Sequence, residues 1–187
     1  DVPLLTACGF GGGILHLLNH ALFKCLLFYA AGAVYRATHT VDLERLGGLV
    51  RRLPRTALLF LVGALAIAAL PPLNGFASEF LVYSALFSGG APTAQADAAL
   101  VAVAATLAFV GAVSAFAMLR AFGLTFLGLP RDEHVHVGAD APPWMSWPML
   151  LHALGIVALG LAPELGLAFL HRVLALFPVG SQADELV

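Results

Sequence analysis

The chain has 187 residues, of which 60% are hydrophobic and only 11% are charged, and its mean hydropathy is +0.93. A soluble domain carries about 25% charged residues, so this composition excludes an ordinary water-soluble domain and favours the bilayer as solvent. The net charge of −2, without a basic stripe, excludes nucleic acid as a partner. We therefore predict an all-α fold, a polytopic transmembrane helix bundle with about four spans, one of them broken.

The first predicted span, residues 4–35, is longer than the roughly 20 residues that cross a bilayer. We expect either a tilted, extended helix or a helix with a local irregularity. The glycines between Gly9 and Gly13 mark the predicted soft point, where the helix bends or packs closely against a neighbour. Because the chain starts at Asp1 in an apolar context, without an initiator Met, we expect it to be part of a longer protein.

Three titratable residues lie inside this apolar segment. His16, His20 and Lys24 follow one another at spacings of four, which places them along one side of a helix. Lys24 is the only lysine of the chain. Because titratable groups are costly inside a membrane, we expect this face to be functional.

The segment 36–55 is predicted to be a loop rich in arginine. Asp42 and Glu44 are its acidic residues, and its five arginines are Arg36, Arg45, Arg51, Arg52 and Arg55. The positive-inside rule places such a loop on the cytoplasmic side. A solvated linker with no fixed side is the alternative.

The second predicted span, residues 56–87, is interrupted by the sequence LeuProProLeuAsnGlyPhe at Leu70–Phe76. Two prolines remove backbone donors and Asn74-Gly75 is a turn signal, so we predict half-helices over 56–70 and about 76–87. Glu79 is expected in the first turn of the second half-helix, where the positive end of the helix dipole favours a carboxylate. A functional role is predicted for Glu79, and a simple helix cap is the alternative.

The third predicted span runs over residues 100–127, after a polar turn at 88–99 that is expected on the outer side. Its Arg120 is expected either to extend to the cytoplasmic interface or to serve a charge path. The loop 128–147 contains His134 and His136 at metal-ligand spacing, but without a third ligand we predict a solvated loop.

The fourth predicted span runs over residues 148–177, with a break at Pro163 after Leu161. Trp144 and Trp147 are expected where the chain re-enters the membrane. His152 and Glu164 are predicted to lie at the interface rather than in a site.

The titratable residues inside the membrane predict proton transfer. Histidine exchanges protons near neutral pH, and burial brings lysine and glutamate towards neutrality. We find no motif for catalysis, for a cofactor or for a metal, so we expect no redox chemistry in this chain. The alternatives are a sodium/proton antiporter subunit using the same path, a haem anchor ligated by His16 or His20 with His152 as partner, and a purely structural bundle.

Three motifs resemble one family: HisLeuLeuAsnHisAlaLeuPheLysCysLeuLeuPheTyrAlaAlaGly, AspLeuGluArgLeuGlyGlyLeu and LeuProProLeuAsnGlyPheAlaSerGluPhe. They are similar to the antiporter-like, proton-conducting membrane subunits of respiratory complex I, multisubunit Na⁺/H⁺ antiporters and group 4 hydrogenases. The resemblance spans residues 4–131. With ArgAlaPheGlyLeuThrPheLeuGlyLeuProArg, it is strongest to the branch formed by the large membrane subunits of hydrogenase 4 and formate hydrogenlyase.

This resemblance implies that residues 1–187 are the C-terminal part of a single transmembrane proton-channel domain, whose first half-channel lies upstream. It implies a multi-pass protein of the inner membrane that associates with other membrane subunits. Such a protein would carry protons, or Na⁺ in the antiporter alternative. The proton path it implies comprises His16, His20, Lys24, Glu79 and Arg120. We expect Lys24 to lie between the histidines and Glu79, close enough to share a water chain with the carboxylate.

Overall fold

The computed structural model describes residues 2–88, 94–174 and 176, and these residues form helices and connecting loops without any strand. This confirms the predicted all-α class. The elements in chain order are α1 (Val2–Thr38), the 3₁₀ helix η1 (Leu49–Arg51), α2 (Pro54–Ile67), α3 (Asn74–Ser88), α4 (Ala94–Phe126), α5 (Pro143–Leu161) and α6 (Pro163–Leu174).

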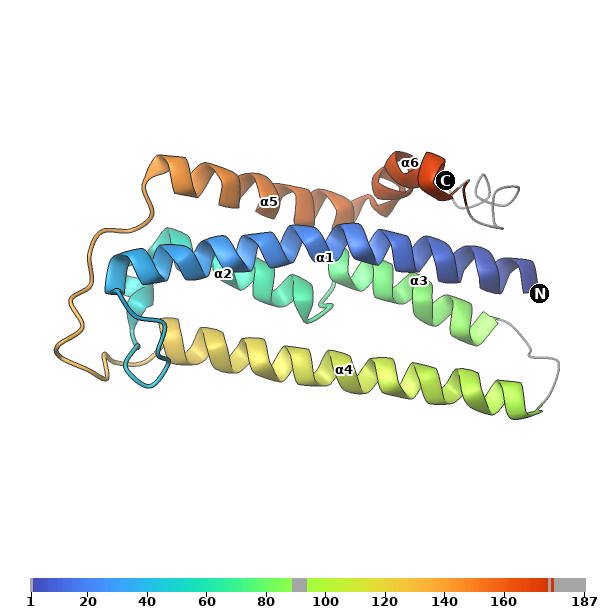
Figure 1. Ribbon diagram of the computed structural model, residues 1–187, viewed down its shortest axis with the longest axis horizontal. Helices are drawn as coiled ribbons and strands as arrows, with labels where there is room; N and C mark the ends of the chain where they lie inside the picture. Colours follow the sequence, from blue (N-terminus) through green and yellow to red (C-terminus); the bar gives the residue numbers. More distant parts are fainter. Residues whose placement is uncertain (1, 89–93, 175, 177–187) are drawn as a thin grey trace.

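The helices form an elongated bundle in which α1 extends along the whole length (Figure 1). The two shorter helices α2 and α3 follow one another beside α1, and α4 and α5 run along the same axis. The loops 39–53 and 127–142 lie together at one end, which we call the loop end. The start of α1 and the end of α3 lie at the opposite end.

Three helices are long and apolar enough to cross a membrane: Cys8–Thr38 with 31 residues, Gln95–Phe126 with 32 and Pro143–Leu161 with 19. Helix α2 has only 14 residues and cannot cross alone. Because α2 and α3 lie end to end, they together occupy the place of a fourth crossing (Figure 1). The architecture is therefore a polytopic helical membrane bundle with one broken helix.

The glycine-rich part of α1 is a site of close packing, and the helix continues through it without interruption. A Cβ atom on Gly12 would lie 3.0 Å from Leu81 Cβ and 3.0 Å from the Val82 backbone nitrogen of α3. Small residues allow membrane helices to approach in this way. Of the two expectations for this segment, the uninterrupted helix is the one found.

The break between α2 and α3 spans residues 68–73 and includes the two prolines, as predicted. Asn74-Gly75, however, is the first turn of α3 and not a loop turn. Gly75 is required there because a side chain would collide with the Ala66 carbonyl at the end of α2. As α3 starts at Asn74, Glu79 lies in the second turn rather than the first, so the dipole argument for its position is weaker than expected.

Helix α5 also packs closely against the backbone of the break. A Cβ on Gly160 would meet the Pro72 carbonyl and lie 2.7 Å from the Leu73 carbonyl carbon and 2.8 Å from the Asn74 nitrogen. The absence of a side chain at Gly160 therefore lets α5 cross directly over the interrupted backbone.

Helix α5 begins earlier than predicted, at Pro143, so Trp144 and Trp147 belong to its first turns and not to the preceding loop. Proline at the start of a helix is favoured because its missing N–H would have no helical partner there. The chain breaks again at Ala162, and α6 starts at Pro163, close to the predicted position.

The main core lies where α1, α2 and α5 meet, around the buried side chains of Phe23, Leu26, Met149 and Ile156. A second cluster at the loop end surrounds Leu53 and Phe126. Helix α4 is different, because most of its apolar side chains remain exposed. Such a surface is stable only against lipid or against further protein.

Candidate functional site

The predicted titratable face of α1 meets α3 just after the break. His16 Nδ1 lies 3.0 Å from Ser78 Oγ, a hydrogen bond between residues 62 positions apart in the chain. Ser78 is completely buried and His16 is partly buried. A histidine at this depth therefore has a specific polar partner on the second half of the broken helix.

A pair of buried asparagines lies beside this contact. Asn19 Nδ2 donates to the Asn74 backbone oxygen at 2.8 Å, and Asn74 Nδ2 donates to Asn19 Oδ1 at 3.1 Å. Both side chains are 0% exposed. In an apolar surrounding each amide would be costly without a partner, so the pair fixes the level at which α1 crosses the start of α3. We call Asn19, Asn74, Ser78 and His16 the crossing cluster.

Two further residues continue along α1 from this cluster. The rings of His16 and His20 have centres 6.3 Å apart, and His20 packs edge-on against Phe23 at 5.3 Å. Lys24 follows one turn later and is partly buried. The structure thus brings His16 and His20 together and places Lys24 next in line on the same helix.

Glu79 follows Ser78 directly but faces another neighbour. A Cβ on Gly111 of α4 would lie 4.0 Å from Glu79 Oε2, so this carboxylate lies against α4. The ion pairs Arg45–Asp132 and Arg120–Glu44 involve neither Lys24 nor Glu79. Lys24 and Glu79 therefore do not form an ion pair.

The order of the titratable groups along the bundle differs from our expectation. Helices α1 and α3 run in opposite directions (Figure 1), and Asn19 meets Asn74 where they cross. Lys24 lies five residues beyond this crossing on α1 and Glu79 five residues beyond it on α3, in the opposite sense. At 1.5 Å per residue the two are about 15 Å apart along the axis. The histidines lie between Lys24 and Glu79, so Lys24 is not the intermediate group.

Arg120 lies apart from Lys24, the histidines and Glu79, which together we call the row. Its Nη2 is 4.0 Å from Glu44 Oε1, and its side chain is 62% exposed. Glu44 belongs to the loop 39–53, so the guanidinium extends to the loop end of the bundle. The Arg120 guanidinium thus lies at one end of the bundle and not beside the histidines of α1.

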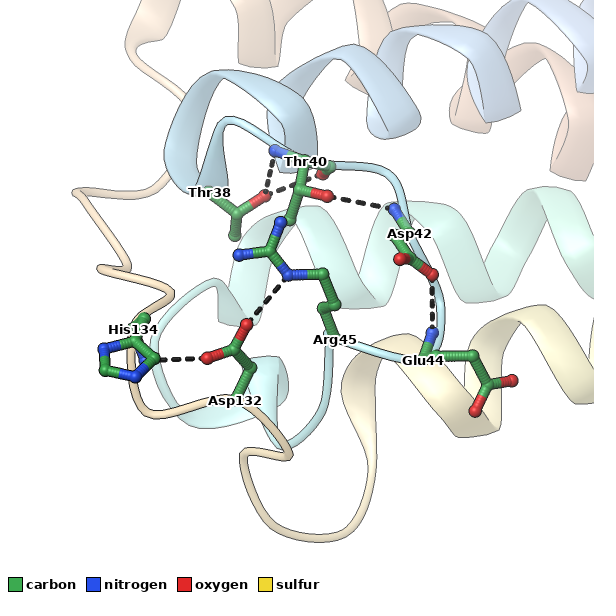
Figure 2. Close-up of polar contacts among 7 residues, drawn as sticks. All are labelled: Thr38, Thr40, Asp42, Glu44, Arg45, Asp132 and His134. Carbon is green, nitrogen blue, oxygen red and sulfur yellow. Dashed lines mark hydrogen bonds and ion pairs between the residues drawn. The ribbon is translucent and has the colours of Figure 1, made fainter.

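The loop end is held together by polar contacts between the two loops (Figure 2). Arg45 Nε donates to Asp132 Oδ2 at 2.8 Å, and the His134 backbone nitrogen donates to Asp132 Oδ1 at 2.8 Å. The hydrogen bond from the Arg45 side chain, followed by that from His134, lowers the pKa of the Asp132 carboxyl. The arginine loop is therefore an ordered part of the bundle.

The described residues contain no group of three or more His, Cys, Asp or Glu side chains that could hold a metal ion. His152, the partner considered for a haem ligand, packs edge-on against Tyr29 with ring centres 5.4 Å apart. Tyr29 lies nine residues from His20 on α1, about 13 Å along the axis. His152 and the two histidines of α1 thus lie at different levels of the bundle.

Three members of the crossing cluster were not among the predicted site residues: Asn19, Asn74 and Ser78. Asn19 lies between His16 and His20 in the same apolar segment, and its amide is as conspicuous there as the imidazoles. A rule that every uncharged polar residue in a span needs a partner would have found it. Asn74 carried only a turn signal in the sequence.

Comparison with known proteins identifies the family to which the chain is similar. A family model described as "NADH:quinone oxidoreductase/Mrp antiporter, TM" matches residues 3–107. Hydrogenase-4 component B of Escherichia coli is 41% identical over 165 residues, covering 86% of this chain and 24% of that protein. Formate hydrogenlyase subunit 3 of the same organism is 42% identical, with coverages of 87% and 27%. The chain thus spans about a quarter of the length of these relatives.

Solved structures agree with this assignment. A chain of an archaeal membrane-bound sulfane sulfur reductase is similar with a TM-score of 0.64 and 28% identity, covering 82% of this chain and 24% of that one. A chain of respiratory complex I from Thermus thermophilus gives 0.58 and 29%, with coverages of 87% and 35%. The Mrp complex from Dietzia sp. DQ12-45-1b shares the fold, with a TM-score of 0.66, 22% identity and coverages of 85% and 36%. This chain belongs to the NADH:quinone oxidoreductase/Mrp antiporter transmembrane family.

Proposed function

We propose that this chain is part of a proton-translocating subunit, without redox chemistry of its own, in a respiratory or hydrogenase-type oxidoreductase complex. Residues 1–187 would form the C-terminal part of one transmembrane proton-channel domain. Other membrane subunits of that complex would be its partners. The similarity to hydrogenase-4 component B and formate hydrogenlyase subunit 3 supports this assignment.

The observation that carries the proposal is the contact between His16 and Ser78. It joins a helix face with three titratable residues to the second half of a broken helix, one residue before Glu79. Interrupted helices at membrane depth occur where the backbone is buried in protein or lines a cavity, and in carriers they mark binding sites. A structural bundle would not need titratable groups on a helix that packs against such a break and on the half-helix that follows it.

The geometry favours the order Lys24, His20, His16, Glu79 for the path. The ring separation of 6.3 Å between His16 and His20 is too long for a direct hydrogen bond and suits one bridging water. The whole row extends about 15 Å along the axis, roughly half of the hydrocarbon thickness. Protons would therefore enter or leave this row through other parts of the full-length protein.

The orientation follows from the loop end. Its arginines would place the loop 36–55 in the cytoplasm, in the inner membrane of the cell. Arg120, which extends to Glu44 at this end, would contribute charge near the cytoplasmic entrance rather than in the middle of the path.

A sodium/proton antiporter subunit is the second candidate, because the matching family description names the Mrp antiporter as well as the oxidoreductase. The same residues would serve both. Sodium-dependent collapse of a pH gradient in vesicles, without an electron donor, would identify the antiporter.

The test uses inverted membrane vesicles that contain the full-length protein in its native complex. We expect Lys24→Ala to abolish proton uptake driven by electron transfer while the rate of electron transfer in uncoupled vesicles is retained. The matched control is Arg172→Ala, which removes an exposed cation from α6. Normal proton uptake in Lys24→Ala would contradict the proposal.

A further inference from the structure

The Ser78 hydroxyl has three polar neighbours but only one hydrogen. Its Oγ lies 3.2 Å from the Asn74 backbone oxygen, 3.1 Å from the Gly75 backbone oxygen and 3.0 Å from His16 Nδ1. The two carbonyl oxygens can only accept. A serine inside a helix commonly donates to the carbonyl three or four residues earlier, which is the geometry here.

The direction of the His16–Ser78 bond follows from this count. If Ser78 donated to Nδ1, its oxygen would face two carbonyl oxygens at hydrogen-bond distance with no hydrogen between them. In a buried site this acceptor-to-acceptor contact is unfavourable. If Ser78 donates to the carbonyls, its lone pair accepts a hydrogen from Nδ1 and all three contacts are satisfied.

We infer that Ser78 is a positioning residue that holds His16 in the tautomer with a protonated Nδ1, which leaves Nε2 as the nitrogen of this ring that exchanges protons. The hydrogen bond made by one ring nitrogen determines the state of the other. Nδ1 donates to Ser78 in the neutral ring and in the imidazolium alike. Gain and loss of a proton therefore occur at Nε2 in both directions.

The asparagine pair maintains the arrangement. Asn19 Nδ2 donates to the same Asn74 carbonyl that Ser78 contacts, and Asn74 Nδ2 returns a bond to Asn19. These two bonds fix α1 against the first turn of α3, so His16 stays level with Ser78. Asn19, Asn74 and Ser78 are completely buried, so the Ser78 oxygen that faces Nδ1 lies inside the bundle.

For proton transfer, which rests on the proposed function, the consequence is that no proton leaves His16 through Ser78. A proton passed from Nδ1 to Ser78 would reach backbone carbonyls, which do not carry it further. His16 would thus receive and return protons on one side of its ring. In the order Lys24, His20, His16, Glu79, His16 would therefore exchange protons with both of its neighbours at Nε2 and not pass them from one ring nitrogen to the other.

The test is ¹⁵N solid-state NMR of the complex with histidine-labelled protein in lipid, with His16 assigned by subtracting the spectrum of His16→Gln. At alkaline pH, where the ring is neutral, we expect a protonated Nδ1 and a bare Nε2. Ser78→Ala should lose this tautomer in favour of a protonated Nε2. Ser78→Thr, which keeps the hydroxyl, should restore it. At acid pH both nitrogens should be protonated in every variant.

A wild-type His16 with protonated Nε2 would overturn the inference, and so would an unchanged tautomer in Ser78→Ala. The measurement needs no turnover, so its outcome is independent of the proposed function. Proton uptake by His16→Gln vesicles tests that function separately. Normal uptake there would contradict proton transfer through His16 and leave the assigned tautomer standing.

Discussion

The crossing of α5 over the broken helix makes a sharp prediction for Gly160→Ala. A methyl group there would meet the Pro72 carbonyl and lie 2.7 and 2.8 Å from backbone atoms of Leu73 and Asn74. Backbone cannot rotate away as a flexible side chain can. Helix α5 must therefore shift from the break, or the break must shift from the crossing cluster.

The size of the effect can be separated from helix propensity by a matched variant on the same helix. Gly155→Ala adds the same methyl group to α5, but its Cβ would lie at an ordinary 3.7 Å from the Leu22 methyl carbons. Both changes gain the same propensity, about 0.8–1 kcal/mol in soluble helices, which cancels in the comparison. The remaining difference is overpacking, so Gly160→Ala should be less stable than Gly155→Ala by about 1–3 kcal/mol.

The assay is unfolding of the purified full-length protein in detergent by titration with SDS, followed by circular dichroism. Proton uptake in vesicles is measured on the same variants, and we expect a loss in Gly160→Ala alone. Equal unfolding midpoints for the two variants would refute the close crossing of α5 over the break. Equal midpoints with normal uptake would also refute the rigid support of the crossing cluster by α5.

Three further predictions concern other contacts. Asn19→Ala and Asn74→Ala should be non-additive in SDS titration, with a coupling of about 0.6 kcal/mol, the average for polar pairs in membrane proteins, and at most about 1.7 kcal/mol. Additive effects would contradict the pair. Leu15→Ala should cost about 2–5 kcal/mol by the same titration, because Leu15 is 0% exposed beneath α6, and a neutral effect would contradict that packing. The third prediction concerns the ion pair between Arg45 and Asp132 at the loop end. The pKa of Asp132 is lowered in the folded protein, so the ionised carboxylate stabilises the fold at neutral pH. This stabilisation is lost as the pH falls through the lowered pKa. Because the pair is exposed, its effect on stability is small. The unfolding temperatures of wild type and Asp132→Asn should therefore differ slightly at neutral pH and not at all in acid. A difference that grows in acid would contradict the predicted direction of the pH dependence.

The sequence was sufficient to predict that membrane helices form and where the break lies, but not where α4 and α5 begin. Apolar segments of spanning length and the Pro71-Pro72 pair are local signals, and local signals determine where a helix can form. The turn prediction for Asn74-Gly75 was wrong because asparagine and glycine also occur where a helix begins under tight packing. The collision that requires Gly75 involves Ala66 across the break, and a pattern of neighbouring residues does not contain it.

The candidate site was only partly predictable. Spacings of four placed His16, His20 and Lys24 on one face of α1, but a single helix gives no information about its register against α3. That register is set by Asn19 and Asn74, which are 55 positions apart. For this reason the order of Lys24 and Glu79 along the bundle emerged only from the packing of the two helices.

The most direct test of the central claim is the number of protons translocated per electron pair in Glu79→Gln, compared with Glu164→Gln in the same complex. Both variants replace one carboxylate by an amide, and Glu164 is exposed at the start of α6. Proton transfer through this chain predicts a lower ratio in Glu79→Gln alone, with electron transfer retained in uncoupled vesicles. An unchanged ratio in Glu79→Gln, or an equal loss in both variants, would contradict it.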